Sequence, residues 1–159
     1  MTQLANADAN VVVEQLRSWN ASAVAQVAEH RGETTIVVPH QLIRATAQQC
    51  RDNPALDFKL LSDVTCVDRF PMEPRFELNY SLVSISRRAR IRLRTSVSVQ
   101  HPVIDSVVPV WPGANWLERE IFDLFGIQFE GHPDLRRILL PDGFEGAPLR
   151  RDFPVEGKR

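Results

Sequence analysis

A proline-rich stretch near the C-terminus constrains the fold of this chain more than any other feature. Residues 131–154 contain Pro133, Pro141, Pro148 and Pro154, and proline blocks both regular helix and central strand. The same stretch carries seven large apolar side chains, which a solvated tail would not keep: Leu135, Ile138, Leu139, Leu140, Phe144, Leu149 and Phe153. We therefore expect an extended tail that lies partly on its own domain and is covered by a second protein.

The residues just before this tail predict a helix over 115–125. Its apolar residues recur at i, i+4, i+7 and i+8 and form one stripe: Leu117, Ile121, Leu124 and Phe125. Asn115 is the expected N-cap, and Glu118 three residues later would complete a capping box. Gly126 is the expected C-terminal glycine in a left-handed conformation.

Charged residues crowd this short helix: Glu118, Arg119, Glu120 and Asp123. Glu120 and Asp123 are neighbours on one face, where like charges repel unless a cation meets them. The tail offers four candidates: Arg136, Arg137, Arg150 and Arg151. Acidic residues near a helix start also favour its dipole, but we expect specific arginine–carboxylate docking. Carboxylates could hold a metal ion, yet interleaved arginines favour ion pairs.

The helix and tail together resemble the signature of the C-type (thirty-kilodalton-type) subunit of type-1 NADH:quinone oxidoreductase, respiratory complex I. The matching positions are Glu118, Arg119, Glu120, Asp123, Gly126, His132, Pro133, Arg136, Arg137, Pro148, Leu149, Arg150, Asp152 and Phe153. The resemblance implies a non-catalytic subunit of the peripheral arm that docks on the D-type subunit, which builds the quinone pocket with the B-type subunit. It also implies that FMN and the iron–sulfur clusters belong to partner subunits and that this chain binds no cofactor.

We expect the subunit interface to use residues of the helix and the tail: Glu118, Arg119, Glu120, Asp123, His132, Arg136, Arg137, Leu139, Phe144, Leu149, Arg150, Arg151, Asp152 and Phe153. His132 is expected to make structural hydrogen bonds. Apolar anchors would supply most of the affinity, and the arginine–aspartate pairs would set the register. We expect no catalytic and no metal-binding residue, because no nucleotide-binding, hydrolase or metalloprotease motif is present.

Composition excludes several other classes of protein. Cys50 and Cys66 are too few for an iron–sulfur cluster, which needs about four thiolates. The net charge of −1 argues against a preference for nucleic acid or membrane. No run of apolar residues is long enough to span a bilayer, and the N-terminus lacks a signal-peptide core. We expect a peripheral protein on the cytoplasmic side of the plasma (inner) membrane, held there only through partner subunits.

The preceding residues predict an α+β domain over residues 1–126, with the docking tail over 127–159. We expect a mixed β-sheet of about five strands with helices packed on it. Helices are predicted over 11–19 (Val12, Leu16 and Trp19 inward), 40–50 and 103–110. A hairpin is predicted over 23–38, and strands over 58–67, 76–86 and 87–99. The apolar pattern shifts at Val83, which suggests a bulge or two-sided burial. Trp111 and Trp116 would anchor the charged helix on the sheet.

Two alternative functions follow from the sequence. The same module is implied in membrane-bound hydrogenases and other quinone-reducing complexes. Separately, alternating Arg88, Arg90, Arg92 and Arg94 place guanidinium groups on one strand face, which could bind RNA. A solvated or partner-facing sheet surface explains this row better, because no aromatic residues interleave with the arginines for base stacking.

Overall fold

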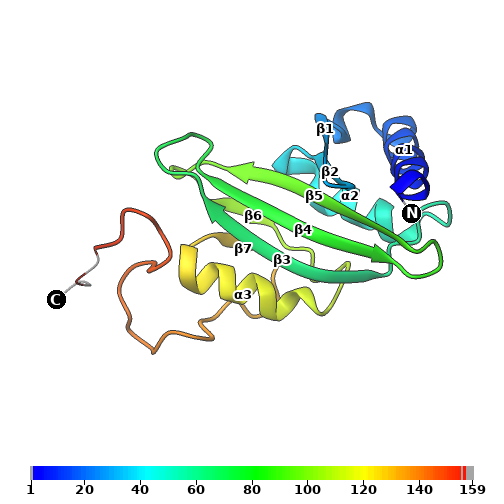
Figure 1. The fold of residues 1–159 in the computed structure, drawn as a ribbon. Helices are drawn as coiled ribbons and strands as arrows, with labels where there is room; N and C mark the ends of the chain where they lie inside the picture. Colours follow the sequence, from blue (N-terminus) through cyan, green and yellow to red (C-terminus); the bar gives the residue numbers. More distant parts are fainter. Residues whose placement is uncertain (1, 155, 157–159) are drawn as a thin grey trace.

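A mixed five-stranded sheet forms the centre of the molecule, as predicted for an α+β fold (Figure 1). The computed structural model describes residues 2–154 and 156. The strand order is β1-β2-β5-β4-β3, with β2 and β5 parallel and the other neighbours antiparallel. The strands are β1 (Gln26–His30), β2 (Glu33–Val37), β3 (Leu60–Asp68), β4 (Phe76–Ser84) and β5 (Ala89–Val97).

The predicted hairpin is confirmed as β1 and β2. Its two turn residues, Arg31 and Gly32, both have positive φ, 51° and 79°. A two-residue turn of this kind matches the right-handed twist of the paired strands.

The bulge suggested near Val83 is not found in β4, whereas the alternative of two-sided burial holds in part, because the face of β4 opposite the core is half-buried. Strand β4 alternates without interruption between buried and half-buried side chains, and the register shift is in β3, between Leu61 and Asp63. The apolar pattern broke because Ile85 belongs to the turn after β4, where its side chain is 77% exposed. Val83 itself is half-buried on the opposite face of the sheet.

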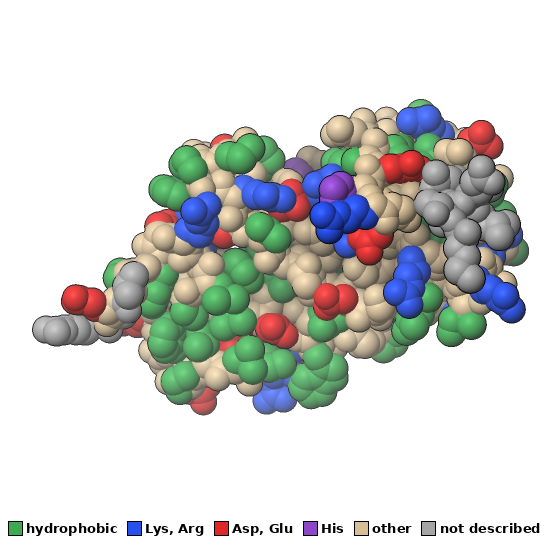
Figure 2. Space-filling view, viewed as in Figure 1, with side chains coloured by type: hydrophobic (Ala, Val, Ile, Leu, Met, Phe, Trp, Pro, Cys, Tyr) green, Lys and Arg blue, Asp and Glu red, His purple; other side chains and the backbone are tan. Residues whose placement is uncertain are grey.

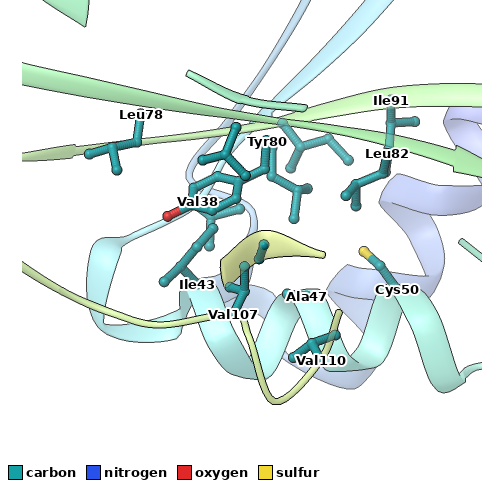
Figure 3. Close-up of a cluster of buried hydrophobic side chains, with 14 of the residues drawn as sticks. Val38, Ile43, Ala47, Cys50, Leu78, Tyr80, Leu82, Ile91, Val107 and Val110 are labelled. Atoms are coloured by element: carbon teal, nitrogen blue, oxygen red, sulfur yellow. The ribbon is translucent and has the colours of Figure 1, made fainter. Parts of the chain in front are cut away.

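Three α-helices accompany the sheet: α1 (Thr2–Trp19), α2 (Ile43–Asp52) and α3 (Ala114–Phe125), with short 3-10 turns at Ala21–Ala23 and His40–Leu42. Figure 3 shows β4 side chains facing the apolar side of α2: Leu78, Tyr80 and Leu82 opposite Ile43, Ala47 and Cys50. Of the residues expected inward on α1, Val12 and Leu16 are buried, whereas Trp19 is 41% exposed.

The prediction of a helix over 103–110 is wrong. Residues Val103–Asp105 form β6, which pairs in parallel with β7 (Gln128–Glu130) as a separate small sheet. The β-branched Val103 and Ile104 favour strand, and Ile104 is buried in the core. The range predicted as tail thus begins with a strand, and the described residues after Glu130 contain no helix or strand.

Helix α3 begins differently from our expectation but ends as expected. Its N-cap is Gly113 with no side-chain capping bond, so the predicted capping box of Asn115 and Glu118 is wrong. The C-terminal cap is confirmed, because Gly126 is left-handed (φ 71°) and donates to the carbonyl of Phe122. Trp111 is buried as predicted, but Trp116 is 63% exposed and does not anchor the helix in the core.

Candidate docking surface

Asp123 of α3 fastens the tail to the domain. Its Oδ2 accepts hydrogen bonds from three consecutive backbone N–H groups, those of Ile138, Leu139 and Leu140, at 3.0, 2.8 and 2.9 Å. Its Oδ1 accepts from the Arg137 guanidinium at 2.7 Å. Burial alone would raise the pKa of Asp123, but these donors outweigh it and lower the pKa to about 2. The carboxylate therefore stays charged and fixes a bend in the tail.

Two arginines extend this attachment. Arg119 of α3 is buried and donates to the backbone carbonyls of Arg136 and Arg137 at 3.0 and 3.2 Å. Its guanidinium also lies 5.1 Å from the centre of the Trp116 ring, a cation–π contact. Arg137 in turn donates to the carbonyl of Phe144 at 2.8 Å, which holds the next part of the tail.

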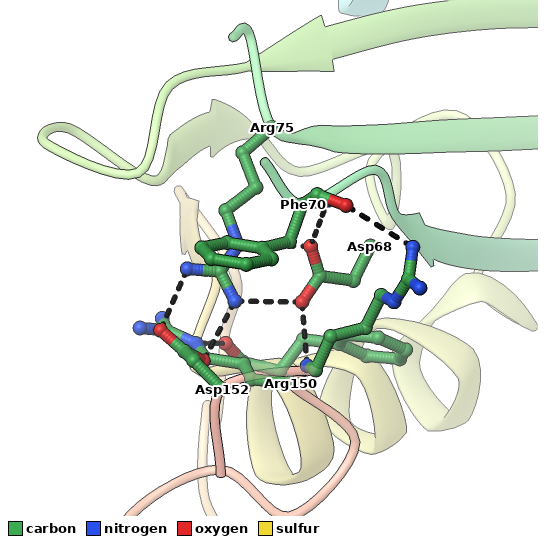
Figure 4. Close-up of polar contacts among 7 residues, drawn as sticks. Asp68, Phe70, Arg75, Arg150 and Asp152 are labelled. Carbon is green, nitrogen blue, oxygen red and sulfur yellow. Dashed lines mark hydrogen bonds and ion pairs between the residues drawn. The ribbon is translucent and has the colours of Figure 1, made fainter. Parts of the chain in front are cut away.

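A second attachment point is built around Arg75, just before β4 (Figure 4). Its guanidinium makes two hydrogen bonds to Asp68 at 2.8 and 2.7 Å and two to Asp152 of the tail at 2.8 and 2.7 Å. The rings of Phe70 and Phe76 lie 5.0 and 5.2 Å from it. The paired geometry satisfies both carboxylates at once, which arginine can do and lysine cannot.

The adjoining tail residues complete this second attachment. The backbone N–H of Arg151 donates to Asp68 Oδ2 at 2.8 Å. Arg150 donates to the carbonyl of Phe125 at 2.6 Å and stacks 4.9 Å from the Phe76 ring. Hydrogen bonds from Arg75 chiefly lower the pKa of Asp68, and backbone donors add to that effect.

Glu118 makes its hydrogen bonds within the domain rather than to the tail. It is fully buried, and it accepts hydrogen bonds from the Ser106 hydroxyl at 2.6 Å and the Val107 N–H at 2.7 Å. Burial raises the pKa of Glu118 to about 7, against the lowering by these donors. These bonds tie α3 to the segment after β6, so any contribution of Glu118 to an interface is indirect.

Although its backbone is anchored, the tail leaves apolar side chains in contact with water. Leu139 and Leu149 are 60% and 52% exposed. Phe144 and Phe153 stack on each other with ring centres 6.2 Å apart and are only half-buried. In Figure 2, hydrophobic side chains gather over α3 and the tail, at the end of the molecule near the C-terminus. We call the exposed side of α3 together with tail residues 131–154 the docking surface.

A groove of about 190 Å³ runs through this surface between β3 and α3. Its apolar walls are supplied by β3 and α3, with one residue from the tail: Val64, Cys66, Leu117, Ile121, Leu124, Phe125 and Leu149. Glu120 lies at its edge and is exposed. An apolar groove with a charged edge suits an apolar anchor from a partner chain.

Residues 36–159 match the protein family described as "Respiratory-chain NADH dehydrogenase, 30 Kd subunit". The chain belongs to this family, whose members include the C-type subunits of NADH-quinone oxidoreductases. The C-type subunit from Roseiflexus sp. (strain RS-1) is 44% identical over 148 residues, which cover 93% of this chain and 85% of the relative. As a member of an enzyme complex, the chain has other subunits of that complex as partners.

Two solved structures share the fold. One is Nqo5 as a trypsin-resistant fragment (1–134), 30% identical, with a TM-score of 0.68 and coverage of 79% of this chain and 99% of the other. The second belongs to the membrane-bound sulfane sulfur reductase, an archaeal respiratory membrane complex. It is 25% identical, with a TM-score of 0.74 and coverage of 92% of this chain and 85% of the other.

The structure brings most predicted interface residues of this complex I protein together around α3 and the tail. His132 makes the structural hydrogen bonds that we expected, to the Asn115 carbonyl at 3.3 Å and from the Asp134 N–H at 3.0 Å. Arg136 projects outward and pairs only with Asp134 among the described residues. Within residues 2–154 and 156, no group of His, Cys, Asp and Glu side chains is arranged to hold a metal ion.

Sequence reasoning missed Asp68 and Arg75. Asp68 is the last residue of β3, Arg75 immediately precedes β4, and both lie more than 70 residues before their tail partners. No periodicity or motif marks them, because long-range pairing leaves no local pattern in a sequence.

The described helices also include none that is both long and apolar enough to cross a bilayer.

Proposed function

We propose that this chain is a structural subunit, without an active site of its own, of the peripheral arm of proton-translocating NADH:quinone oxidoreductase. It docks on the D-type subunit near the quinone site, with the B-type subunit close by. Electrons pass from NADH through FMN and iron–sulfur centres in partner subunits to quinone. The chain lies on the cytoplasmic side of the membrane and reaches it only through those partners.

One observation carries this proposal: buried charges hold the tail on a defined path, while two of its large apolar side chains remain exposed and the others are only half-buried. Asp123 and Arg75 together make six hydrogen bonds to a segment that contributes little to the core. A preorganised extended segment loses less conformational entropy when a partner covers it, and this strengthens binding. Exposed Leu139 and Leu149 are the anchors that such a partner would bury.

The test replaces Leu139 and Leu149 by aspartate in the full chain, expressed with the other subunits in its own host. Because both side chains are exposed, the free energy of unfolding of the isolated chain should change by less than about 0.5 kcal/mol per substitution. Co-purification of the D-type subunit should nevertheless fall by about tenfold or more. The matched control is Ile85→Asp, an exposed apolar residue in the turn after β4. Normal assembly of the double variant would contradict the proposal.

A second candidate is the equivalent subunit of a membrane-bound hydrogenase or other quinone-reducing complex with a different electron donor. The similarity to the structure from the archaeal sulfane sulfur reductase complex favours it, because that complex carries the same fold. Purified complex that reduces quinone with NADH supports the first candidate. Complex that is inactive with NADH but active with another donor supports the second.

A further inference from the structure

The face of the sheet that points away from α3 carries a groove that the docking surface does not use. The groove has a volume of about 380 Å³ and lies across β2, β5, β4 and β3. Its polar lining includes Glu33, Ser62, Ser81, Arg88, Arg90 and Arg92. Alternation along β5 explains the charge: Ile91 and Leu93 face the core, so Arg90 and Arg92 face outward.

The positive charge of this groove is only partly neutralised by the chain itself. Arg92 pairs with Glu33 at 2.8 Å, and further along β5 Arg94 pairs with Glu77 at 3.7 Å. Arg88 and Arg90 are exposed and form no ion pair with any of the described residues. In a chain whose net charge is −1, two unpaired guanidinium groups in one groove favour an anionic occupant.

The spacing of the arginines points to an extended occupant. Arg90 and Arg92 are two apart on β5 and are therefore separated by about 6.8 Å, as are alternate residues of any extended peptide. Arg88, which we expected in the same strand row, instead lies in the turn before β5 with a φ of 53°. An occupant with carboxylates at alternate positions can therefore meet successive guanidinium groups, each of which can bind a carboxylate through two hydrogen bonds. The neighbouring hydroxyl group of Ser81 offers a further donor, whereas the Ser62 hydroxyl already donates to the backbone carbonyl of Ser81 at 3.1 Å.

We propose that this groove binds an extended acidic segment, with carboxylates at alternate positions, from another protein of the same complex. The proposal rests on membership of the complex but not on the docking of the tail, which uses the opposite side of the sheet. A single-stranded RNA would also meet the guanidinium groups with its phosphates. Among the described residues, no aromatic side chain lines the groove for base stacking, so a protein segment is the better match.

The first experiment measures binding of labelled peptides to the purified full chain by fluorescence anisotropy. The probes are a peptide of alternating glutamate and serine, an isomer with its glutamates consecutive, and a version with glutamine in place of glutamate. We expect the alternating peptide to bind best, the glutamine version to show no binding, and salt to weaken the interaction. Arg88→Glu with Arg90→Glu should weaken binding about tenfold or more.

The matched control is Arg17→Glu with Arg136→Glu, which makes the same change in charge at two exposed arginines outside the groove and away from its arginines in the sequence. Its binding should stay within about twofold of the wild-type value. Equal binding of the glutamine peptide, or unaltered binding by the Arg88 and Arg90 variant, would overturn the proposal. Tighter binding of a single-stranded RNA oligonucleotide of the same length would also overturn it and would assign the groove to nucleic acid.

The second experiment places a photo-crosslinking residue at Ser81 in the assembled complex from its own host. Mass spectrometry should identify a segment rich in aspartate and glutamate from another protein of the complex. Absence of a crosslink, or a crosslink to a segment without carboxylates, would contradict the proposal that the groove binds an acidic segment. The Leu139→Asp and Leu149→Asp chain should still bind the acidic peptide, which separates failure of this inference from failure of tail docking.

Discussion

Arg75 and Asp152 are 77 residues apart in the chain, yet their side chains meet through two hydrogen bonds of 2.8 and 2.7 Å. Arg75 is almost fully buried and also holds Asp68, whereas Asp152 is half exposed. The pair thus connects the interior of the domain to the tail. Together with the contacts of Asp123, it explains why a segment without helix or strand has a defined path.

Replacement of Arg75 by alanine should destabilise the domain strongly, because it leaves the buried carboxylate of Asp68 without its cation. We expect a loss of about 3–5 kcal/mol in the free energy of unfolding, measured by urea denaturation. Arg69→Ala is the control, since its pair with Glu77 is more exposed and should contribute less than about 1 kcal/mol. If the two variants lost similar amounts of unfolding free energy, the buried Arg75 pair would contribute no more to stability than an exposed ion pair, which would contradict the prediction.

Substitution Asp123→Asn should release the bend at residues 138–140. The amide that replaces the carboxylate keeps the shape but accepts the three N–H donors only weakly, so their amide hydrogen exchange should accelerate. The pKa of Asp123 is lowered from 3.8 to about 2, so its stabilisation is complete above pH 3.8 and is lost as the pH falls towards 2. The difference between wild type and variant should vanish over that interval; a pH-independent difference would contradict this account.

Glu118 should give the opposite pH dependence. Its pKa is raised from 4.5 to about 7, so the folded chain retains a proton that the unfolded chain has released. Stability from this group is therefore greatest below pH 4.5 and declines as the pH rises to about 7, by roughly 3 kcal/mol. The Glu118→Gln variant should lack this decline, while Glu120→Gln, an exposed neighbour, should keep it. Chemical denaturation at a series of pH values measures both.

Reversal of charge at Arg150 and Arg151 should prevent assembly by a different route from the leucine variants. Arg150 contacts the Phe125 carbonyl and the Phe76 ring, so the double substitution to glutamate detaches the tail within the chain itself. Limited trypsin digestion of the isolated variant should then cleave at Arg136 and Arg137 faster than in wild type. The leucine variants should lose assembly with an unchanged digestion rate. Full assembly and NADH:quinone activity of the arginine variant would refute this prediction.

Local pattern was enough to predict much of this chain. Alternation identified β4 and β5, the turn signal at residues 30–32 identified the hairpin, and Gly126 identified the end of α3, because each depends on contacts within a few residues. The same reasoning failed at 103–110, where pairing of β6 with β7 about 25 residues away decided the conformation. The prediction of a capping box at Asn115 also failed, because its expected partner Glu118 is buried and accepts hydrogen bonds from Ser106 and Val107 instead.

The residues of the tail are enough to show that it is neither a helix nor a solvated coil, since prolines and large apolar side chains are interspersed along it. The place where the tail lies follows from the folded domain. Its path depends on Asp68, Arg75 and Asp123, which act through hydrogen bonds to residues distant in the chain. Such pairs form only after the sheet and α3 have brought their side chains together, and for that reason no local pattern reveals them.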